Sequence, residues 1–291
     1  MKNMAQRILV FVIGIPSIAA IVLFLPHYHH IVFNLLVVIF SGLGAAEFSA
    51  MLSHKNLVIS KMEAAVFGAL PPAAMILVVS FGAGDLLLSA VFAAVAAWLL
   101  LSRTFSSGGP LENFICRFAA GLAALVYPGM LLAWIVRISQ WEKNAGILIF
   151  TFLLMVFSGD SLAWALGMAF GKGNQGLVPA SPNKSVAGFI GGIIAPVIVG
   201  IGAVLILPDV FVPGRASIPC SPVAAGCILG LLTGIAAILG DLGESALKRS
   251  SGIKDSGSII PGRGGVLDSI DSLALAAPVF CLVFGLLFSQ S

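Results

Sequence analysis

The sequence predicts an all-α, polytopic integral membrane protein of about nine transmembrane helices with a cytoplasmic N-terminus. Of the 291 residues, 59% are hydrophobic and 9% are charged, whereas an ordinary soluble domain carries about a quarter charged residues. The mean hydropathy is +1.10. A hydrocarbon core about 30 Å thick needs about 20 apolar residues per crossing helix, so the chain can supply many spans and no large soluble domain. We expect the lipid bilayer to surround it and no nucleic acid to be a partner.

Apolar stretches bounded by charge, Gly or Pro predict where the spans lie. They fall near 8–25, 31–52, 62–81, 86–102, 115–136, 146–171, 186–207, 222–247 and 266–289. The first stretch resembles a signal peptide, but it lacks a convincing small-residue cleavage site and many spans follow it, so we expect it to stay as a membrane helix. The prediction divides the chain into an N-terminal scaffold of about five helices, residues 1–145, and a C-terminal catalytic part, residues 146–291.

The Lys and Arg residues predict the orientation, because basic loops are retained on the cytoplasmic side. With the N-terminus inside, Arg137, Lys143 and Arg215 fall outside. The other twelve of the fifteen basic residues then face the cytoplasm: Lys2, Arg7, Lys55, Lys61, Arg103, Arg117, Lys172, Lys184, Lys248, Arg249, Lys254 and Arg263. This predicts a multi-pass protein of the cell inner (cytoplasmic) membrane whose active site faces the cytoplasm.

Acidic residues gather in the segment 240–272. Five of the twelve in the chain lie there: Asp241, Glu244, Asp255, Asp268 and Asp271. A charge beside lipid costs a few kcal/mol unless it is paired or hydrated, which favours a functional cluster. The alternative is a solvated cytoplasmic loop. That alternative explains Asp255 well, but it explains less well why Asp241 and Asp268 stand where apolar spans end and begin.

Helical spacing places these side chains on common faces. The positions i, i+3, i+4 and i+7 on one helix are Asp241, Glu244, Ser245 and Lys248. Asp268 and Asp271 repeat the i, i+3 spacing on the next helix. If the two helix ends face each other, their carboxylates can converge on a hard divalent cation, for which Mg²⁺ is the natural candidate.

A glycine-rich run, residues 261–265, precedes the last span. Glycines such as Gly264 and Gly265 let backbone N–H groups approach phosphate oxygens at a helix N-terminus. The alternative is a tight turn that only feeds the helix.

A second polar island covers residues 158–188. Asp160 lies deep within an apolar stretch, so we expect it to face the protein interior. Around Ser181 and Lys184, hydroxyls and an ammonium can bind phosphate. The alternative for Lys172 and Lys184 is that they only mark the cytoplasmic side of the membrane.

These residues resemble the phosphatidate cytidylyltransferases, also called CDP-diacylglycerol synthases. The family signature is in register with Ser245, Leu247, Lys248, Arg249, Lys254, Asp255, Gly257, Ile260, Pro261, Gly264, Gly265, Val266, Asp268, Ile270 and Asp271. The family's other polar block looks like Asp160, Ser161, Ala163, Gly167, Gly171, Lys172, Ser181, Pro182, Lys184 and Ser185. The chain departs from the pattern at Arg263, Ser269 and Ala187, where the family usually has His, Arg and Glu. Arg263 keeps a cation beside the glycine pair.

The resemblance implies a nucleotidyltransferase that converts CTP and phosphatidate into CDP-diacylglycerol and pyrophosphate in phospholipid biosynthesis. It implies catalytic roles for Asp241, Lys248, Arg249, Asp268 and Asp271. We expect Asp241, Asp268 and Asp271 to hold Mg²⁺, with a second cation optional. The substrate phosphates would contact Lys184, Ser181, Lys254, Arg263, Gly264 and Gly265, and the polar cavity would be lined by Asp160, Glu244, Ser245 and Asp255. A homodimer is left open.

Other functions fit parts of the pattern. A CTP-dependent polyprenol or lipid kinase would use similar metal and phosphate groups, but it would release CDP instead of pyrophosphate. A CDP-alcohol phosphotransferase needs the string D-G-x-x-A-R, which the sequence lacks. A secondary transporter also uses intramembrane carboxylates, but the polar residues do not recur in two halves. An aspartyl intramembrane protease, built on Asp160 and Asp241, would leave the basic residues and glycines of 248–265 without a role.

Overall fold

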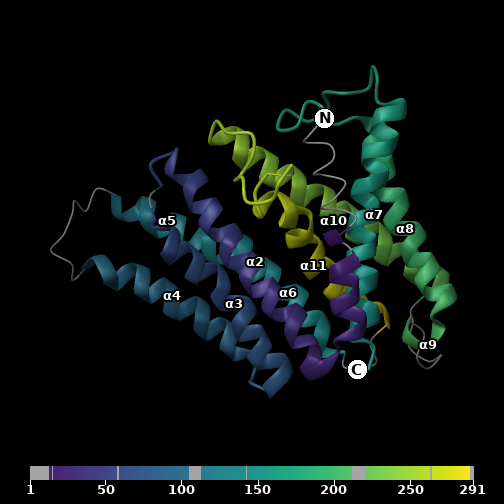
Figure 1. The fold of residues 1–291 in the computed structure, drawn as a ribbon, viewed down its shortest axis with the longest axis horizontal. Helices are drawn as coiled ribbons and strands as arrows, with labels where there is room; N and C mark the ends of the chain where they lie inside the picture. Colours follow the sequence, from purple (N-terminus) through teal and green to yellow (C-terminus); the bar gives the residue numbers. More distant parts are fainter. Residues whose placement is uncertain are drawn as a thin grey trace. The chain divides into compact units, whose positions relative to one another are not determined.

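The computed structural model describes residues 13–14, 16–57, 59–104, 113–141, 143–211, 220–262 and 264–288 (Figure 1). This part of the chain is built from helices, with isolated β-bridges between Gln175 and Ser185 and between Ile260 and Gly264. The elements are α2 (His27–Ser53), α3 (Lys61–Phe81), α4 (Leu86–Thr104), α5 (Phe114–Ala124), the π-helix η2 (Leu125–Met130), α6 (Leu131–Arg137), the 3₁₀ turn η3 (Ile138–Gln140), α7 (Ala145–Phe170), α8 (Val186–Ile206), α9 (Pro208–Phe211), α10 (Pro222–Ser250) and α11 (Leu267–Phe288).

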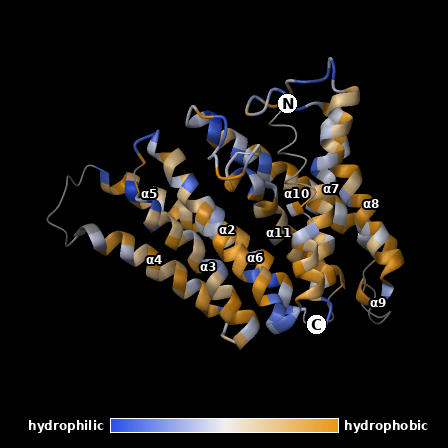
Figure 2. Ribbon diagram, in the orientation of Figure 1, coloured by the Kyte–Doolittle hydropathy of each residue, from blue (hydrophilic) through white to orange (hydrophobic). Residues whose placement is uncertain are grey.

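Seven helices of the described chain are long and apolar enough to cross a membrane. They are His27–Ser53, Lys61–Phe81, Phe114–Gln140, Ala145–Phe170, Val186–Ile206, Pro222–Ser250 and Leu267–Phe288. Each matches one of the predicted spans, so the all-α, multi-pass membrane class is confirmed. The predicted span 86–102 is a shorter apolar helix, Leu86–Ser102, and the predicted span 8–25 lies partly outside the described residues. Hydrophobic residues cover the lengths of the helices, and hydrophilic residues collect at helix ends and connections (Figure 2).

The chain forms two compact units. Unit 1 contains residues 1–146 and 247–270, and unit 2 contains residues 147–246 and 271–291. The C-terminal part predicted from the sequence, residues 146–291, is divided between the two units, because the connection between α10 and α11 packs with the first-half helices. This segment is polar and short of apolar side chains, so its own sequence did not indicate which helices it would contact. The division into scaffold and catalytic parts stays a prediction.

Small residues let the helices of unit 1 approach closely. A Cβ on Gly68 of α3 would lie 2.4 Å from the Cβ of Ala45 and 2.8 Å from the carbonyl oxygen of Ser41, both on α2. The Ser41 hydroxyl is within hydrogen-bond distance of the Gly68 carbonyl oxygen, at 2.7 Å, and of the Pro128 carbonyl oxygen. Without a hydrophobic force between helices in lipid, such close backbone packing is what holds them together.

Small residues also allow close packing in unit 2, between α8 and α10. A Cβ on Gly200 would lie 2.2 Å from the carbonyl oxygen of Gly226, and one on Gly230 would lie 2.2 Å from that of Pro196. Phe152 of α7 packs against Phe280 of α11, with ring centroids 5.3 Å apart. The small-residue seam brings α8 against α10 and so determines which side chains face the cavity described below.

We expect Gly200→Ala to lower the thermal stability of the purified protein in detergent, because the new methyl group overlaps backbone atoms of α10 and overpacking costs about 1–3 kcal/mol. Gly202→Ala is the matched control on the same helix, because no atom lies within 4 Å of its Cβ position. Equal melting temperatures for the two variants would contradict the close packing of α8 and α10.

Candidate active site

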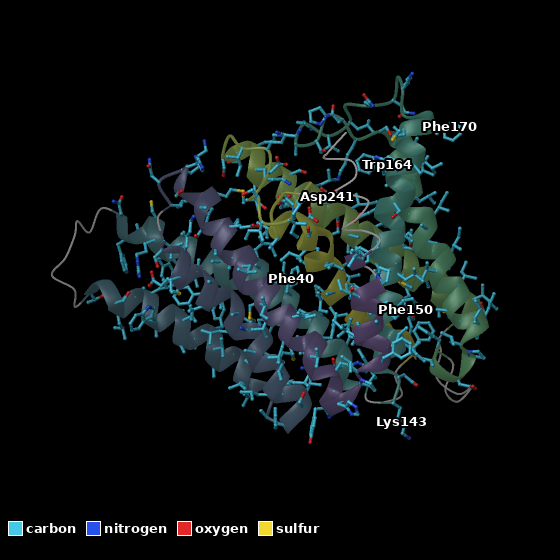
Figure 3. The ribbon with its side chains drawn as sticks, in the orientation of Figure 1. Phe40, Lys143, Phe150, Trp164, Phe170 and Asp241 are labelled. Atoms are coloured by element: carbon cyan, nitrogen blue, oxygen red, sulfur yellow. The ribbon has the colours of Figure 1, made fainter. Side chains whose placement is uncertain are left out.

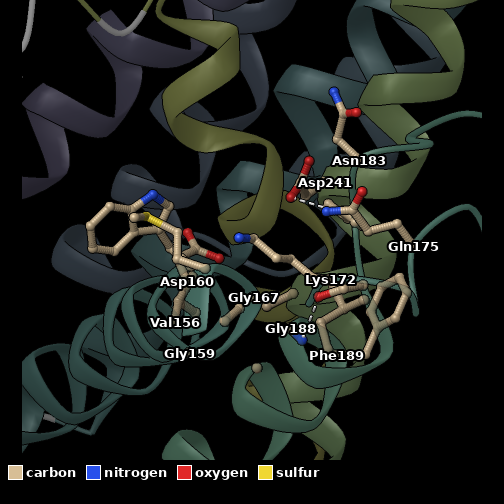
Figure 4. Close-up of a pocket in the computed structure, with 18 residues that line it drawn as sticks. Val156, Gly159, Asp160, Gly167, Lys172, Gln175, Asn183, Gly188, Phe189 and Asp241 are labelled. Carbon is tan, nitrogen blue, oxygen red and sulfur yellow. Dashed lines mark hydrogen bonds and ion pairs between the residues drawn. The ribbon is translucent and has the colours of Figure 1, made fainter. Parts of the chain in front are cut away.

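Unit 2 contains a cavity of about 510 Å³ between α7, α8, α10 and the connection that joins α7 to α8. Its polar lining includes Asp160, Lys172, Asn183, Lys184 and Asp241. Asp160 and Lys172 project into the same space in the close-up view (Figure 4). A cavity that combines carboxylates with ammonium groups suits an anionic ligand held by cations.

Apolar side chains line the rest of this cavity. Trp164, Met168 and Phe189 are among them, and Trp164 and Met168 are each 64% exposed. Phe170, the last residue of α7, is also exposed and projects outward (Figure 3). The cavity therefore offers both charged and apolar side chains, which suits a lipid with a charged head.

Lys184 and Asp241 form an ion pair inside unit 2. The Nζ atom of Lys184 lies 2.5 Å from Oδ2 of Asp241, and the hydroxyl of Ser245 contacts the other oxygen at 3.4 Å. Their side chains are 28% and 33% exposed, so both still reach the cavity. The pair holds the ammonium of Lys184 against α10, nine residues before the helix ends at Ser250.

The connection 171–185 presents Lys184 through a series of local turns. The N–H of Lys184 donates to the carbonyl oxygen of Ser181 at 3.1 Å. Ser185 then caps α8 by accepting the N–H of Gly188 at 3.1 Å. Ser181, predicted to bind phosphate, is placed by the structure in the turn that presents Lys184.

Two further acidic side chains lie buried near the end of α10. Glu244 is 0% exposed and Asp271 is 7% exposed. Asp271 interacts electrostatically with Asp241, Glu244 and Asp160. A Cβ on Gly240 would lie 2.4 Å from the carbonyl oxygen of Asp271, so α10 and α11 touch at this point. The predicted residues Asp160, Asp241, Glu244 and Asp271 are thus brought together in unit 2.

Asp268 organises a separate polar cluster in unit 1. Its Oδ1 atom lies 2.6 Å from Nζ of Lys248. Its Oδ2 atom accepts the N–H of Gly265 at 2.7 Å and both the N–H and the hydroxyl of Ser256, at 3.0 and 2.9 Å. The side chains of Asp268 and Lys248 are 8% and 13% exposed. Both oxygens of Asp268 are therefore used within the protein.

The local structure of this loop requires glycine at two positions, because a Cβ there would overlap neighbouring side chains. Gly264 adopts φ +111°, and a Cβ there would lie 2.6 Å from Oδ2 of Asp268. A Cβ on Gly265 would lie 2.2 Å from the hydroxyl oxygen of Ser256. The tight-turn alternative thus has structural support, while phosphate binding by Gly264 and Gly265 stays a prediction.

Glu47 of α2 belongs to the same cluster, although it is not among the residues predicted from the sequence. Its Oε2 atom accepts the N–H of Leu267 at 2.9 Å and lies 3.2 Å from the hydroxyl of Ser256. The signal was present, because Glu47 is a lone acidic residue inside a predicted span. Like Asp160, Glu47 would be costly beside lipid without a partner, so it is expected to face the protein interior.

The remaining predicted residues are on the surface or outside the described chain. Arg249, Lys254 and Asp255 are exposed, and Arg263 lies outside the described residues. Contact between these side chains and substrate stays a prediction.

The carboxylates partly fit the predicted Mg²⁺. Asp241 and Asp271 offer the oxygen ligands that this ion prefers, and they interact with each other. Asp241 and Asp268 each already carry an ion pair, with Lys184 and Lys248, and Asp268 also accepts backbone N–H groups. Over the ranges that the structure describes, no group of three His, Cys, Asp or Glu side chains is arranged to hold a metal ion. Because Asp241 and Asp268 belong to different units, a cation shared between them stays a prediction.

The fold and the polar sites define a multi-pass membrane protein with cationic and acidic groups at its helix ends. A model of the cytidylyltransferase family matches residues 5–287, and the chain belongs to this family. The resemblance found in the motif of residues 245–271 is confirmed at this level.

Curated bacterial proteins resemble the chain over much of its length. It is 42% identical over 135 residues to a protein of Haemophilus influenzae named phosphatidate cytidylyltransferase, covering 46% of this chain and 44% of that protein. It is 33% identical over 216 residues to one of the same name from Brucella abortus, covering 72% and 74%. It is 33% identical over 210 residues to the uncharacterized protein YnbB of Escherichia coli, covering 70% and 65%. The matched part thus spans from under half to about three quarters of these relatives.

We expect Asp268→Asn to loosen the loop 251–262, because the amide loses the charge that strengthens the contacts to Lys248, Ser256 and Gly265. Trypsin should then cut after the exposed Lys254 about tenfold faster, which corresponds to a loss of about 1.4 kcal/mol of local stability. Mass spectrometry of the fragments measures this rate.

Asp85→Asn is the matched control for that experiment. It also removes one carboxylate from an ion pair of unit 1, with Arg137, but this carboxylate is 66% exposed and makes none of the loop contacts. An unchanged cleavage rate in Asp268→Asn would contradict the organising role of Asp268.

Proposed function

We propose that the protein transfers the cytidylyl group of CTP to phosphatidate, giving CDP-diacylglycerol and pyrophosphate. The observation that carries this proposal is the family match over residues 5–287, together with relatives named phosphatidate cytidylyltransferase. The cavity of unit 2 agrees with it, because its lining joins lysines to exposed apolar side chains. The family match favours this activity over a polyprenol kinase and over a transporter.

The reaction needs little proton chemistry. An oxygen of the phosphatidate phosphate attacks the α-phosphorus of CTP, a new phosphorus–oxygen bond forms, and the bond to the β-phosphate breaks so that pyrophosphate leaves with its electron pair. A phosphate monoester is already a nucleophile near neutral pH. The protein's task is therefore to align two anions and to neutralise their charge.

Lys184 is the residue best placed to neutralise phosphate in the cavity of unit 2. Its ammonium is held by Asp241, yet 28% of the side chain remains exposed. Lys172 lines the same cavity and supplies a second positive charge. Trp164 and Met168 would contact the apolar part of the lipid, since they line the cavity and are largely exposed.

We expect Mg²⁺ to be held by Asp241 and Asp271, whose carboxylates suit a hard cation. When bound, this ion would withdraw charge from the phosphate oxygens as the pyrophosphate leaves. Asp268 was also predicted as a ligand, and a second cation was predicted as optional. Both stay predictions, as does a homodimer.

The proposed topology has nine spans with the N-terminus inside the cell and the active site on the cytoplasmic side of the inner membrane. Two ion pairs of unit 1 support the prediction that successive connections alternate between the two sides of the membrane. Arg117 pairs with Glu63, and both are expected inside; Arg137 pairs with Asp85, and both are expected outside. Each pair therefore joins two residues that the positive-inside rule assigns to the same side, which supports the alternation but not its direction.

We expect Lys184→Gln to lower kcat/KM for cytidylyl transfer at least about a hundredfold, because one positive charge beside the reacting phosphates is lost. Purified protein is incubated with radiolabelled CTP, phosphatidate and Mg²⁺, and the label in the lipid phase is counted. Lys143→Gln removes an exposed ammonium that is not part of the cavity lining and should keep wild-type activity. Release of CDP in place of pyrophosphate by the wild type would instead indicate a kinase.

A cysteine introduced at Ser258 should resist a membrane-impermeant maleimide in intact spheroplasts and react after permeabilisation, because the loop faces the cytoplasm in the proposed topology. A cysteine introduced at Lys143 should react in both states. The background is a variant without the native cysteines Cys116, Cys220, Cys227 and Cys281, which are free thiols. The opposite labelling pattern would reverse the orientation.

A further inference from the structure

Glu47 is a buried acid that the proposed reaction does not yet use. It lies on α2, far in sequence from the motif of residues 245–271, and it is 8% exposed. Within the described chain, its Oε1 atom is buried and accepts no hydrogen bond. A carboxylate that leaves a buried oxygen unbonded is poorly optimised for stability alone, because that oxygen has lost its water. Its other contacts indicate why it is placed there.

The bonded oxygen of Glu47 joins α2 to the start of α11 and to the preceding loop. Oε2 accepts the N–H of Leu267 at 2.9 Å, the first residue of α11, and lies 3.2 Å from the hydroxyl of Ser256. The same hydroxyl lies 2.9 Å from Oδ2 of Asp268 and accepts the Asp268 N–H at 3.3 Å. Ser256 is thus a bridge between the two carboxylates.

The loop closes tightly around the Glu47 carboxylate. A Cβ on Gly257 would lie 2.3 Å from Oε1, and a Cβ on Gly265 would lie 2.3 Å from Oε2. These glycines leave room for a side chain of the length of Glu47 and for little else. The position of the carboxylate and the conformation of the loop therefore determine each other.

We propose that Glu47 is a positioning residue for cytidylyl transfer, which rests on the function proposed above. Through Leu267 and Ser256 it fixes the start of α11 and hence the carboxylate of Asp268. Asp268 in turn holds Lys248, for which the family resemblance implies a catalytic role. Glu47 itself touches no substrate; it determines where Lys248 is presented.

Three substitutions test this role. In Glu47→Gln the amide oxygen can accept both hydrogen bonds while the NH₂ takes the place of the unbonded oxygen, so kcat should stay within about threefold of wild type. In Glu47→Asp the carboxylate is one methylene too short to reach Leu267 and Ser256, and in Glu47→Ala it is absent. Both should lower kcat about 10–100-fold, the size expected when a supporting residue is lost.

A merely structural acid would behave differently. It would reduce the yield of folded protein but leave kcat per folded molecule unchanged. Glu63→Ala is the matched control, because Glu63 is also an acid of unit 1 in an ion pair, with Arg117, and makes none of the loop contacts. We expect it to lower stability and to keep kcat. If Glu47→Ala yields no folded protein, Glu47→Asp and Ser256→Ala carry the test.

A double-mutant cycle tests the route through Ser256. Because the two side chains act on the same loop, Glu47→Ala combined with Ser256→Ala should lose about as much kcat as the more damaging single variant, instead of the product of both losses. Independent, multiplying losses would overturn the bridge. Wild-type kcat in both Glu47→Asp and Glu47→Ala would overturn the positioning role altogether.

Tryptic cleavage after Lys254 separates this inference from the proposed function. If the wild type transfers no cytidylyl group, the proposed function fails, but Glu47→Ala should still expose Lys254 to trypsin about tenfold faster than wild type. If the wild type is active and neither kcat nor cleavage changes in Glu47→Ala, the inference fails and the proposed function stands.

Discussion

A carboxylate beside lipid needs a charged or hydrogen-bonding partner, and this constraint shapes both polar parts of the protein. In unit 1, Lys248 and the loop hold Asp268. In unit 2, Lys184 holds Asp241. In each case a carboxylate near a helix end is matched by groups from the neighbouring connection or helix end. The acidic residues therefore order the polar segments, and the segments in turn stabilise the acidic residues.

The glycine content of the loop before α11 follows from the same constraint. Several acceptor groups, from Glu47, Ser256 and Asp268, occupy the space into which side chains at Gly257, Gly264 and Gly265 would project. Backbone donors must come very close to the carboxylates to replace water, and a Cβ would prevent that approach. A motif that resembles a phosphate-binding turn is thus also required by the protein's internal hydrogen bonds.

The proposed chemistry suits such an arrangement. Transfer between two polyanions depends on cations held in place before the substrates bind, because reorganisation during the reaction would raise its barrier. Ion pairs that leave part of a lysine exposed, as at Lys184, meet this need. The cavity of unit 2 adds apolar side chains beside the charges, so one surface can accept both the head and the hydrophobic part of a lipid.

Hydrophobic thickness sets helix length, so the sequence by itself determined the class of fold and the approximate bounds of the seven helices that are long and apolar enough to cross a membrane. The sequence also indicated Asp241, Lys248 and Asp268 as candidate site residues, because charged residues are conspicuous in an apolar chain. Only the tertiary structure showed that Lys184 pairs with Asp241, and that Glu47 reaches Leu267 across 220 positions of sequence. Spacing along one helix predicts a shared face. Contacts between distant helices depend on packing, which local patterns do not encode.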